Sequence, residues 1–168
     1  MSPLVRRTLA PRGTTPILKP TAKHREKVSI MAALTISPRR HRLGLYWRTY
    51  PRNSVNSQRS ADFLRDLLRH LRGPVIVVWD GGSMHKGDPI RDLLRRFSRL
   101  SLERLPPYAP ELNPVEYLWN HLKYGQLPNF VPDDVFQLDA VLKRHLKRAR
   151  NSSERLRSFL EACELPFW

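Results

Sequence analysis

The chain has little cysteine and no long apolar run. A single cysteine, Cys163, cannot form a disulfide within the chain, which favours a reducing compartment. The longest apolar runs, Ile30–Leu34 and Val75–Trp79, are far too short to cross a bilayer. The N-terminal arginines are not followed by the apolar stretch of a secretory signal. We therefore expect a cytoplasmic protein without a membrane partner.

Acidic residues are scarce as well. The 168 residues include 15 Asp and Glu against 30 Lys and Arg, a formal net charge of +15. Glu26 is the only acid before Asp62. This excess predicts binding to a polyanion, most often nucleic acid. Charge alone leaves open a ribosomal protein, a membrane-surface protein or a genome with an arginine bias.

The hydrophobic pattern predicts one α/β domain over 28–168, preceded by a Pro/Arg-rich segment over 1–27. The N-terminal segment could hold a short extended stretch at Thr15–Leu18. Two β-rich runs flank a polar turn and predict an antiparallel hairpin. Helical spacing of leucines then alternates with short apolar runs, which predicts a mixed sheet with helices on its faces. The expected strands are 28–37, 42–50, 75–79 and 100–105; the expected helices are 57–71, 90–97, 113–124, one from 135 and one around 156–163.

A carboxylate follows the most apolar strand. The stretch V-I-V-V-W-D-G-G-S-M-H places Asp80 directly after Val75–Trp79 and before two glycines. Ligand-binding groups collect at the carboxyl ends of strands in open α/β sheets, and Mg²⁺ prefers carboxylate oxygens. Asp80 is therefore either a metal ligand or part of an ordinary turn. His85 either faces the same cleft or is a solvated loop histidine.

A second carboxylate, Glu116, lies at the start of a predicted helix after a proline-rich loop. Residues 106–123 read P-P-Y-A-P-E-L-N-P-V-E-Y-L-W-N-H-L-K. Asn113 suits the N-cap, so Glu116 fits a capping box. Glu116 also shares a polar helix face with Asn120 and Lys123, which suits a metal and phosphate site. The spacing alone supports both interpretations.

Together these strings resemble a known family. The string L-P-P-Y-A-P-E-L-N-P-V-E-Y-L-W-N-H-L-K resembles the L-P-P-Y-S-P-x-L-N-P-I-E-x-x-W-x-x-L-K motif of mariner-type DDE transposases, including bacterial insertion-sequence transposases. The glutamate of that motif is the third catalytic acid. V-V-W-D-G-G-S-M-H resembles the stretch that carries the second acid. Near the N-terminus, R-R-T-L-A-P-R-G-T-T-P resembles the segment that follows the first acid.

The resemblance implies a ribonuclease-H-like mixed sheet flanked by helices, and two-metal phosphoryl transfer with Mg²⁺ or Mn²⁺ on DNA. It implies that Asp80 and Glu116 are the catalytic and metal-binding acids. We take Lys123, Asn120, His85 and Arg12 as candidate DNA-binding residues. Family members cut transposon ends and join them to target DNA. The resemblance further suggests a homodimer in a bacterial cytoplasm, nucleoid-associated when bound to DNA.

The sequence departs from the family pattern at its start. No acid precedes Glu26, so the first catalytic aspartate has no counterpart, and we expect the first strand to be missing. The helix-turn-helix domain that reads transposon ends is also absent from this sequence. A site without its bridging carboxylate should bind metal weakly or not at all, and the isolated chain should be inactive. The rest of the enzyme could be a second polypeptide from an upstream reading frame, or the gene could be mis-started or decayed. The alternative function is a non-catalytic basic nucleic-acid-binding protein or a regulator of the full transposase.

Overall fold

The computed structural model describes residues 10–14 and 27–163. Its first feature is the predicted hairpin of β1 (Val28–Ser37) and β2 (Arg42–Pro51). The two strands are antiparallel, in a register that runs from Val28 opposite Pro51 to Ser37 opposite Arg42. The tight turn between them is closed by a hydrogen bond from the Arg40 N–H to the Ser37 carbonyl, 3.2 Å. The hairpin prediction is confirmed, and β2 is one residue longer than expected.

A helix–strand–helix–strand segment follows the hairpin. Its elements are α1 (Ser57–His70), β3 (Val75–Trp79), the short 3₁₀ turn η1 (Ser83–His85), α2 (Asp88–Arg96) and β4 (Leu100–Arg104). α1 begins because the Asn56 side chain accepts a hydrogen bond from the Arg59 N–H, 2.9 Å. β3 and β4 are parallel, as expected for strands joined through a helix. α2 begins two residues earlier than predicted, with Pro89 in its first turn.

The remainder of the described chain is helical. It contains the 3₁₀ turn η2 (Pro110–Leu112), α3 (Pro114–Asn120), the π-helical turn η3 (His121–Gln126), α4 (Val135–Arg150) and α5 (Ser153–Glu161). The single helix predicted over 113–124 is therefore an α-helix that widens into a π turn. The Leu127 N–H closes the widened turn on the Leu122 carbonyl, 3.0 Å. The α4 prediction is confirmed, and the Asp134 side chain caps it through the Gln137 N–H, 2.7 Å.

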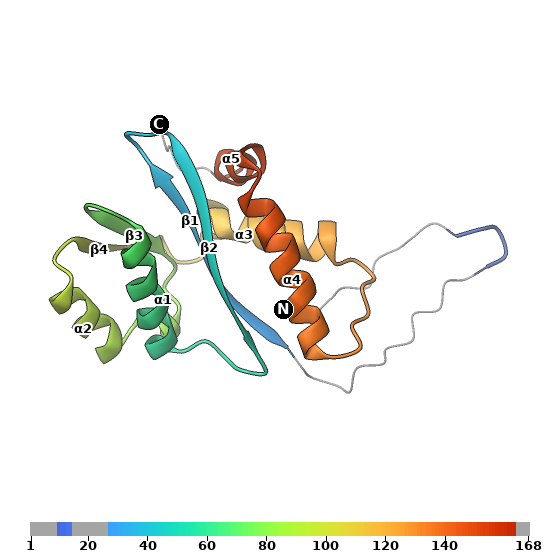
Figure 1. Ribbon diagram of the computed structural model, residues 1–168, viewed down its shortest axis with the longest axis horizontal. Helices are drawn as coiled ribbons and strands as arrows, with labels where there is room; N and C mark the ends of the chain where they lie inside the picture. Colours follow the sequence, from blue (N-terminus) through green and yellow to red (C-terminus); the bar gives the residue numbers. More distant parts are fainter. Residues whose placement is uncertain (1–9, 15–26, 164–168) are drawn as a thin grey trace.

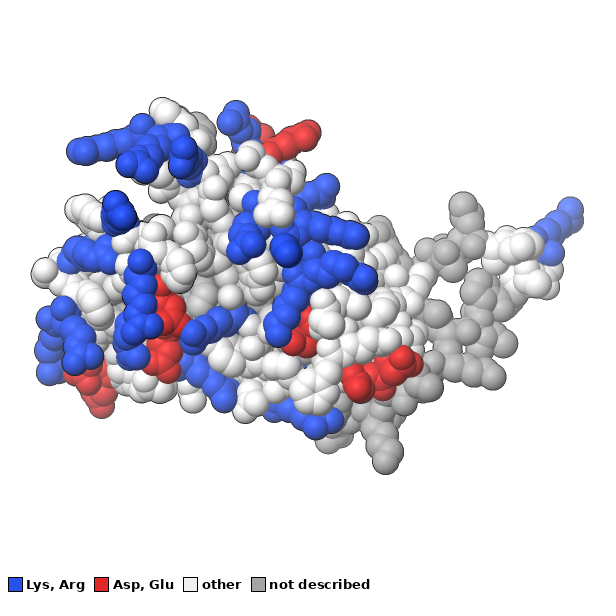
Figure 2. Space-filling model, viewed as in Figure 1, with Lys and Arg blue, Asp and Glu red and all other residues white. Residues whose placement is uncertain are grey.

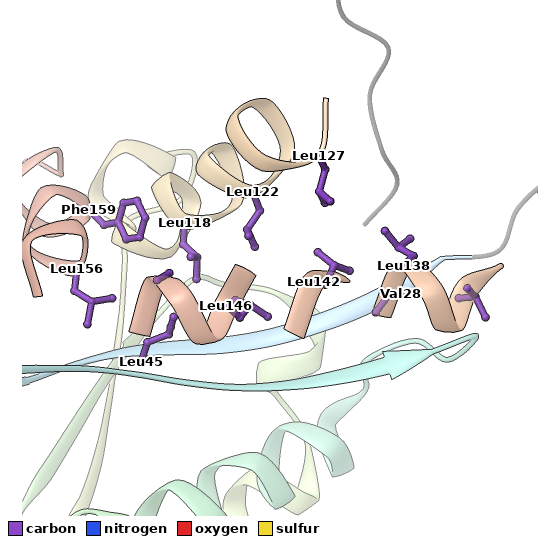
Figure 3. Packing of buried hydrophobic residues seen from close by; sticks show 12 residues of the cluster. Val28, Leu45, Leu118, Leu122, Leu127, Leu138, Leu142, Leu146, Leu156 and Phe159 are labelled. Carbon is purple, nitrogen blue, oxygen red and sulfur yellow. The ribbon is translucent and has the colours of Figure 1, made fainter. Parts of the chain in front are cut away.

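The hairpin lies in the middle of the molecule. Figure 1 shows α3, α4 and α5 on one side of it, and α1, α2, β3 and β4 on the other. The helices on the first side pack their leucines onto one face of the hairpin (Figure 3). We call this cluster the C-terminal core. Its residues are Val28, Leu45, Leu118, Leu122, Leu127, Val135, Leu138, Leu142, Leu146, Ala149, Leu156 and Phe159.

A second cluster, the α1 core, lies between α1, α2 and the β3–β4 pair. Its buried residues are Ala61, Leu64, Leu67, Leu68, Trp79, Ile90, Leu93 and Leu100. Ala33 and Tyr46, which face each other across the hairpin, also pack against this cluster. α1 therefore contacts both strand pairs.

The predicted α/β class with helices on the strand faces is confirmed, whereas the predicted mixed sheet is divided. The strands of the described residues form two separate two-stranded sheets, β1–β2 and β3–β4. No described strand lies between them to join their hydrogen-bond ladders. The predicted extended stretch at Thr15–Leu18 lies outside the described residues. Among the helices that the structure describes, none combines the length and the apolar character needed to cross a bilayer.

Candidate functional site

Asp80 lies at the carboxyl end of β3, in a turn that depends on glycine. Its Oδ1 accepts a hydrogen bond from the Gly82 N–H, 2.8 Å, while 57% of the side chain stays exposed. A Cβ at Gly82 would lie 2.5 Å from the Met84 sulfur and 2.9 Å from Asp80 Oδ1. A Cβ at Gly81 would meet nothing within 4 Å. Only at the second glycine would an added methyl group meet neighbours, the ends of the Met84 and Asp80 side chains, and its N–H holds the carboxylate in place.

His85 packs beside Asp80. Its ring stacks on Trp79 with centroids 4.3 Å apart, and its Nε2 lies 3.5 Å from Asp80 Oδ1. The side chain is only 17% exposed, and Nδ1 is buried with no hydrogen-bond partner among the residues that the structure describes. Burial lowers the pKa of His85, and the nearby Asp80 carboxylate opposes that shift. The candidate DNA-binding residue His85 thus presents little surface to DNA, and its main polar neighbour is the carboxylate.

Glu116 lies in the first turn of α3. The Asn113 side chain caps this helix through the Val115 N–H, 3.1 Å, whereas the Glu116 N–H bonds to the Asn113 backbone carbonyl, 2.9 Å. Within the described residues the Glu116 carboxylate accepts no hydrogen bond, so the reciprocal bond of the predicted capping box is absent. The N-cap is confirmed, but capping does not explain this carboxylate.

The charges of Lys123 and Asp80 both act on Glu116, although the three residues come from different parts of the chain. Burial raises the pKa of Glu116, the Lys123 ammonium opposes this, and the negative charge of Asp80 adds to it. The fold therefore brings the carboxylate after β3 to the carboxylate of α3, with a cation on η3 beside them. Asn120, at the end of α3, is exposed.

Arg12 is not part of this cluster. It is exposed in a turn closed by a hydrogen bond from the Thr14 N–H to the Pro11 carbonyl, 3.0 Å. Figure 1 draws residues 10–14 far from β3 and α3.

The carboxylate oxygens of Asp80 and Glu116 are the type of ligand that a hard divalent cation prefers. Such an ion would stabilise the charged form of Glu116, which burial and Asp80 disfavour. However, among residues 10–14 and 27–163 no group of three or more His, Cys, Asp or Glu side chains is placed to hold a metal ion. The residues present therefore fit Mg²⁺ by chemistry and provide too few ligands for tight binding.

A basic face on α4 was not assigned to DNA binding from the sequence. Its exposed side chains are Lys143, Arg144, Lys147, Arg148 and Arg150, and blue atoms gather over this helix in Figure 2. Asp139 is the only acid of α4, and it pairs with Lys143 at 2.7 Å. The density of basic residues in 143–150 was the signal, and the favourable helix dipole had explained it without a ligand.

One exposed aromatic side chain was also missed. Tyr108, in the proline-rich loop before α3, is 100% exposed and has a positive φ of 61°. A bare ring on a stiff loop can stack on an unpaired base.

An α/β fold with a carboxylate after a strand and another on a following helix defines the class of DDE-type nucleases. Residues 2–138 match the family described as DDE superfamily endonuclease. Since this match spans most of the chain, the protein belongs to that family. Among curated proteins, none matches this chain.

Solved structures of the Mos1 transposase have a similar fold. The Mos1 strand transfer complex matches with a TM-score of 0.64 and 18% identity, over 95% of this chain and 46% of that chain. The Mos1 paired-end complex with the left transposon end gives 0.62 and 18%, over 95% and 46%. The catalytic domain of Mos1 mariner transposase gives 0.55 and 17%, over 82% and 72%. The chain thus spans about half the length of the first two and has the ribonuclease-H-like fold of the catalytic domain.

Proposed function

We propose that this chain is a DNA-binding and phosphoryl-transfer domain for DNA transposition, with Asp80 and Glu116 as its second and third acids. The observation that carries the proposal is the family match over residues 2–138, which include both carboxylates. The two motifs support the assignment of the two acids, and the negative charge of Asp80 helps to raise the pKa of Glu116.

In this proposal each polar residue has a distinct task. Asp80 and Glu116 would hold Mg²⁺ or Mn²⁺, which activates the attacking water or 3′-hydroxyl and stabilises the leaving oxygen when bound. Lys123 would balance part of the negative charge and contact a phosphate of the DNA. The Gly82 N–H donates a hydrogen bond to Asp80, and His85, stacked on Trp79, lies beside the same carboxylate. Arg12 and Asn120 remain proposed contacts to DNA.

We further propose that the isolated chain is inactive because two acids are not a complete site. A complete site of this kind takes a third acid beside Asp80 and Glu116. Sequencing the DNA upstream of the Met1 codon shows whether an apolar strand followed by Asp is encoded there.

A nicking assay on labelled DNA with Mg²⁺ or Mn²⁺ tests this inactivity. We expect no cleavage above background by the chain alone. Robust cleavage that Asp80→Ala abolishes would show that residues 1–168 hold a complete site.

The basic face of α4 supports DNA binding by phosphate contacts. We expect salt-dependent binding, with each lost phosphate contact reducing the slope of log affinity against log salt by about 0.9. Lys147→Glu together with Arg148→Glu should weaken binding at every DNA sequence. Glu154→Gln, an exposed change on α5, is the control. Unchanged binding by the double variant would remove α4 from the interface.

The alternative is a non-catalytic binder or a regulator of a complete transposase. This alternative function requires only the basic surface, so Asp80→Ala and Glu116→Ala should leave the affinity for DNA unchanged. If these variants change metal-dependent DNA binding, the carboxylates take part in function and the alternative fails.

A further inference from the structure

Two histidines and an arginine meet where η3, α4 and α5 pack together. Both η3 and α5 contact α4, and α5 also contacts α3. Arg155 Nη1 lies 3.2 Å from Nδ1 and 3.1 Å from Nε2 of His121, whose ring also lies against Phe159 with centroids 5.6 Å apart. His145 of α4 is close enough for its charge to act on His121. We call His121, His145 and Arg155 the histidine–arginine cluster.

The histidine–arginine cluster gathers positive charge without a counter-ion. The charges of Arg155 and His145 act on His121. Those of Arg144 and Arg148 act on His145. Within residues 10–14 and 27–163, none of these three arginines forms an ion pair with Asp or Glu. Because like charges repel one another, an anion bound among these groups would lower their electrostatic energy.

Arg155 lies at the end of α5 that disfavours a cation. It is in the first turn of this helix, where the dipole favours an acid such as Glu154. The same dipole rule favours the basic side chains in the last turn of α4, which need no ligand to account for them. The helix dipole therefore does not explain Arg155, and its guanidinium faces a histidine ring in place of a carboxylate.

The contact between Arg155 and His121 depends on the protonation state of the imidazole. A guanidinium can only donate, so the ring nitrogen that it bonds to must accept through a lone pair. Burial and the neighbouring cations favour this neutral form, since they lower the pKa of both His121 and His145. A protonated imidazole donates from both nitrogens and offers no acceptor. Protonation of His121 would therefore replace the bond by repulsion, unless an anion accepts hydrogen bonds from both groups.

We propose that the histidine–arginine cluster binds a phosphate group, with the exposed Arg144 and Arg148 beside it. A phosphate accepts several charge-assisted hydrogen bonds and would supply the acceptor that a protonated His121 lacks. The inference rests on the proposed function for the source of the phosphate, a DNA backbone; a free phosphate compound has the same chemistry. Because the bound anion stabilises the imidazolium form, binding takes up protons. Affinity should therefore rise as the pH falls through about 6.5, the usual pKa of histidine.

Nuclear magnetic resonance of the histidine rings in the full chain tests the site, with sulfate as the probe. Sulfate has the shape of a phosphate and keeps a constant charge over the range of about pH 5–8 in which histidine titrates. We expect sulfate to shift the ring signals of His121 and His145 and to raise the pKa of both. His70, on α1, is the internal control and should not respond. Unchanged His121 and His145 signals in excess sulfate would overturn the inference.

Variants of α5 separate a site from general attraction to a basic protein. Arg155→Gln should weaken sulfate binding by about tenfold, because it removes a charged donor from an exposed position. Arg157→Gln is the matched control: it removes the same charge from an exposed residue of the same helix, two residues further on and on another face. Equal losses in the two variants would overturn the inference.

The histidines are tested through the pH dependence. His121→Gln together with His145→Gln should abolish the rise in sulfate affinity on acidification. A rise that persists in this double variant would overturn the role of the histidines. Arg155→Gln, in which both histidines remain, should keep the rise at a lower affinity.

A duplex oligonucleotide distinguishes the two sources of phosphate. If DNA shifts the same histidine signals, and Arg155→Gln weakens its binding more than Arg157→Gln does, the ligand is a backbone phosphate. If sulfate shifts the signals and DNA does not, the phosphate site stands and its ligand is a free phosphate compound. Both titrations are made without divalent metal and without a nicking readout. Failure of this site would therefore leave the proposed chemistry of Asp80 and Glu116 untouched.

Discussion

The C-terminal core and the α1 core are built from similar residues, yet only the first is closed. Leu118, Leu122, Leu142 and Leu146 in the C-terminal core are all 0% exposed. The β3–β4 pair of the α1 core is covered on one face, and Ile76 and Val78 remain exposed on the other. The candidate site draws on both regions. Asp80 follows β3, which packs in the open α1 core, and Glu116 lies on α3, which packs in the closed C-terminal core. Asp80 and Glu116 therefore lie on elements whose relative positions depend on how two separate sheets, β1–β2 and β3–β4, pack together.

The largest difference between the two regions should appear when one apolar side chain is truncated in each. Leu142→Ala should lower the free energy of unfolding by about 2–5 kcal/mol, because it leaves a cavity in a closed core. Val78→Ala should cost less than about 1 kcal/mol, because its side chain is already half in water. Urea unfolding measures both. Equal losses would show that β3 is as tightly packed as α4, against the comparison.

The two glycines after Asp80 provide a matched pair within the open region. Gly82→Ala should cost at most about 1 kcal/mol, since the new methyl group would displace the ends of the Met84 and Asp80 side chains. Gly81→Ala should have little effect, because it meets no neighbour. Thermal unfolding compares the two variants. If Gly81→Ala were the more damaging change, the turn would have a different geometry in solution.

The N-caps of two helices can also be compared: that of α4 in the C-terminal core and that of α3 at the candidate site. Asp134→Ala and Asn113→Ala should each cost about 1 kcal/mol, because each leaves a backbone N–H of the first turn without its partner. Asn113→Ala should additionally speed hydrogen exchange in 114–120, where Glu116 lies. An unchanged exchange rate there would mean that the proline-rich loop alone positions Glu116.

The smallest effect is a pH dependence that both regions share. Burial lowers the pKa of His121 beside Arg155 in the closed region, and of His85 beside Asp80 in the open one. A depressed histidine pKa means that the unfolded chain binds more protons below about pH 6.5, so stability should fall on acidification through that value. His121→Gln and His85→Gln should each flatten part of the slope of melting temperature against pH. A slope unaffected by both variants would assign the pH dependence to other groups.

The local structure of this chain was largely predictable because its signals lie within a few residues. The hairpin, α1, β3 and α4 were expected from apolar spacing, and Asn113 from cap chemistry. The motif also indicated Asp80 and Glu116 as a pair, and the electrostatic interaction between them agrees with that. Their catalytic and metal-binding roles stay predictions.

The features that were not predicted depend on contacts between distant residues. A continuous mixed sheet was expected, because an apolar strand indicates a buried position without naming its neighbours. The stacking of His85 on Trp79 and the π turn that carries Lys123 also escaped the sequence pattern. Each depends on how an element is packed against others, which residue spacing does not encode.

By itself, then, the sequence determined which segments form helices and strands, where the main caps lie, and which two acids end up next to rigid elements. These outcomes follow from hydrogen bonds and side-chain preferences within one or two turns of the chain. Only the tertiary structure decided that Asp80 and Lys123 act on Glu116, that Ile76 and Val78 are exposed, and that the two sheets of the described residues are separate. Those outcomes depend on long-range packing, in which each strand edge and each charge is defined by elements far away in the sequence.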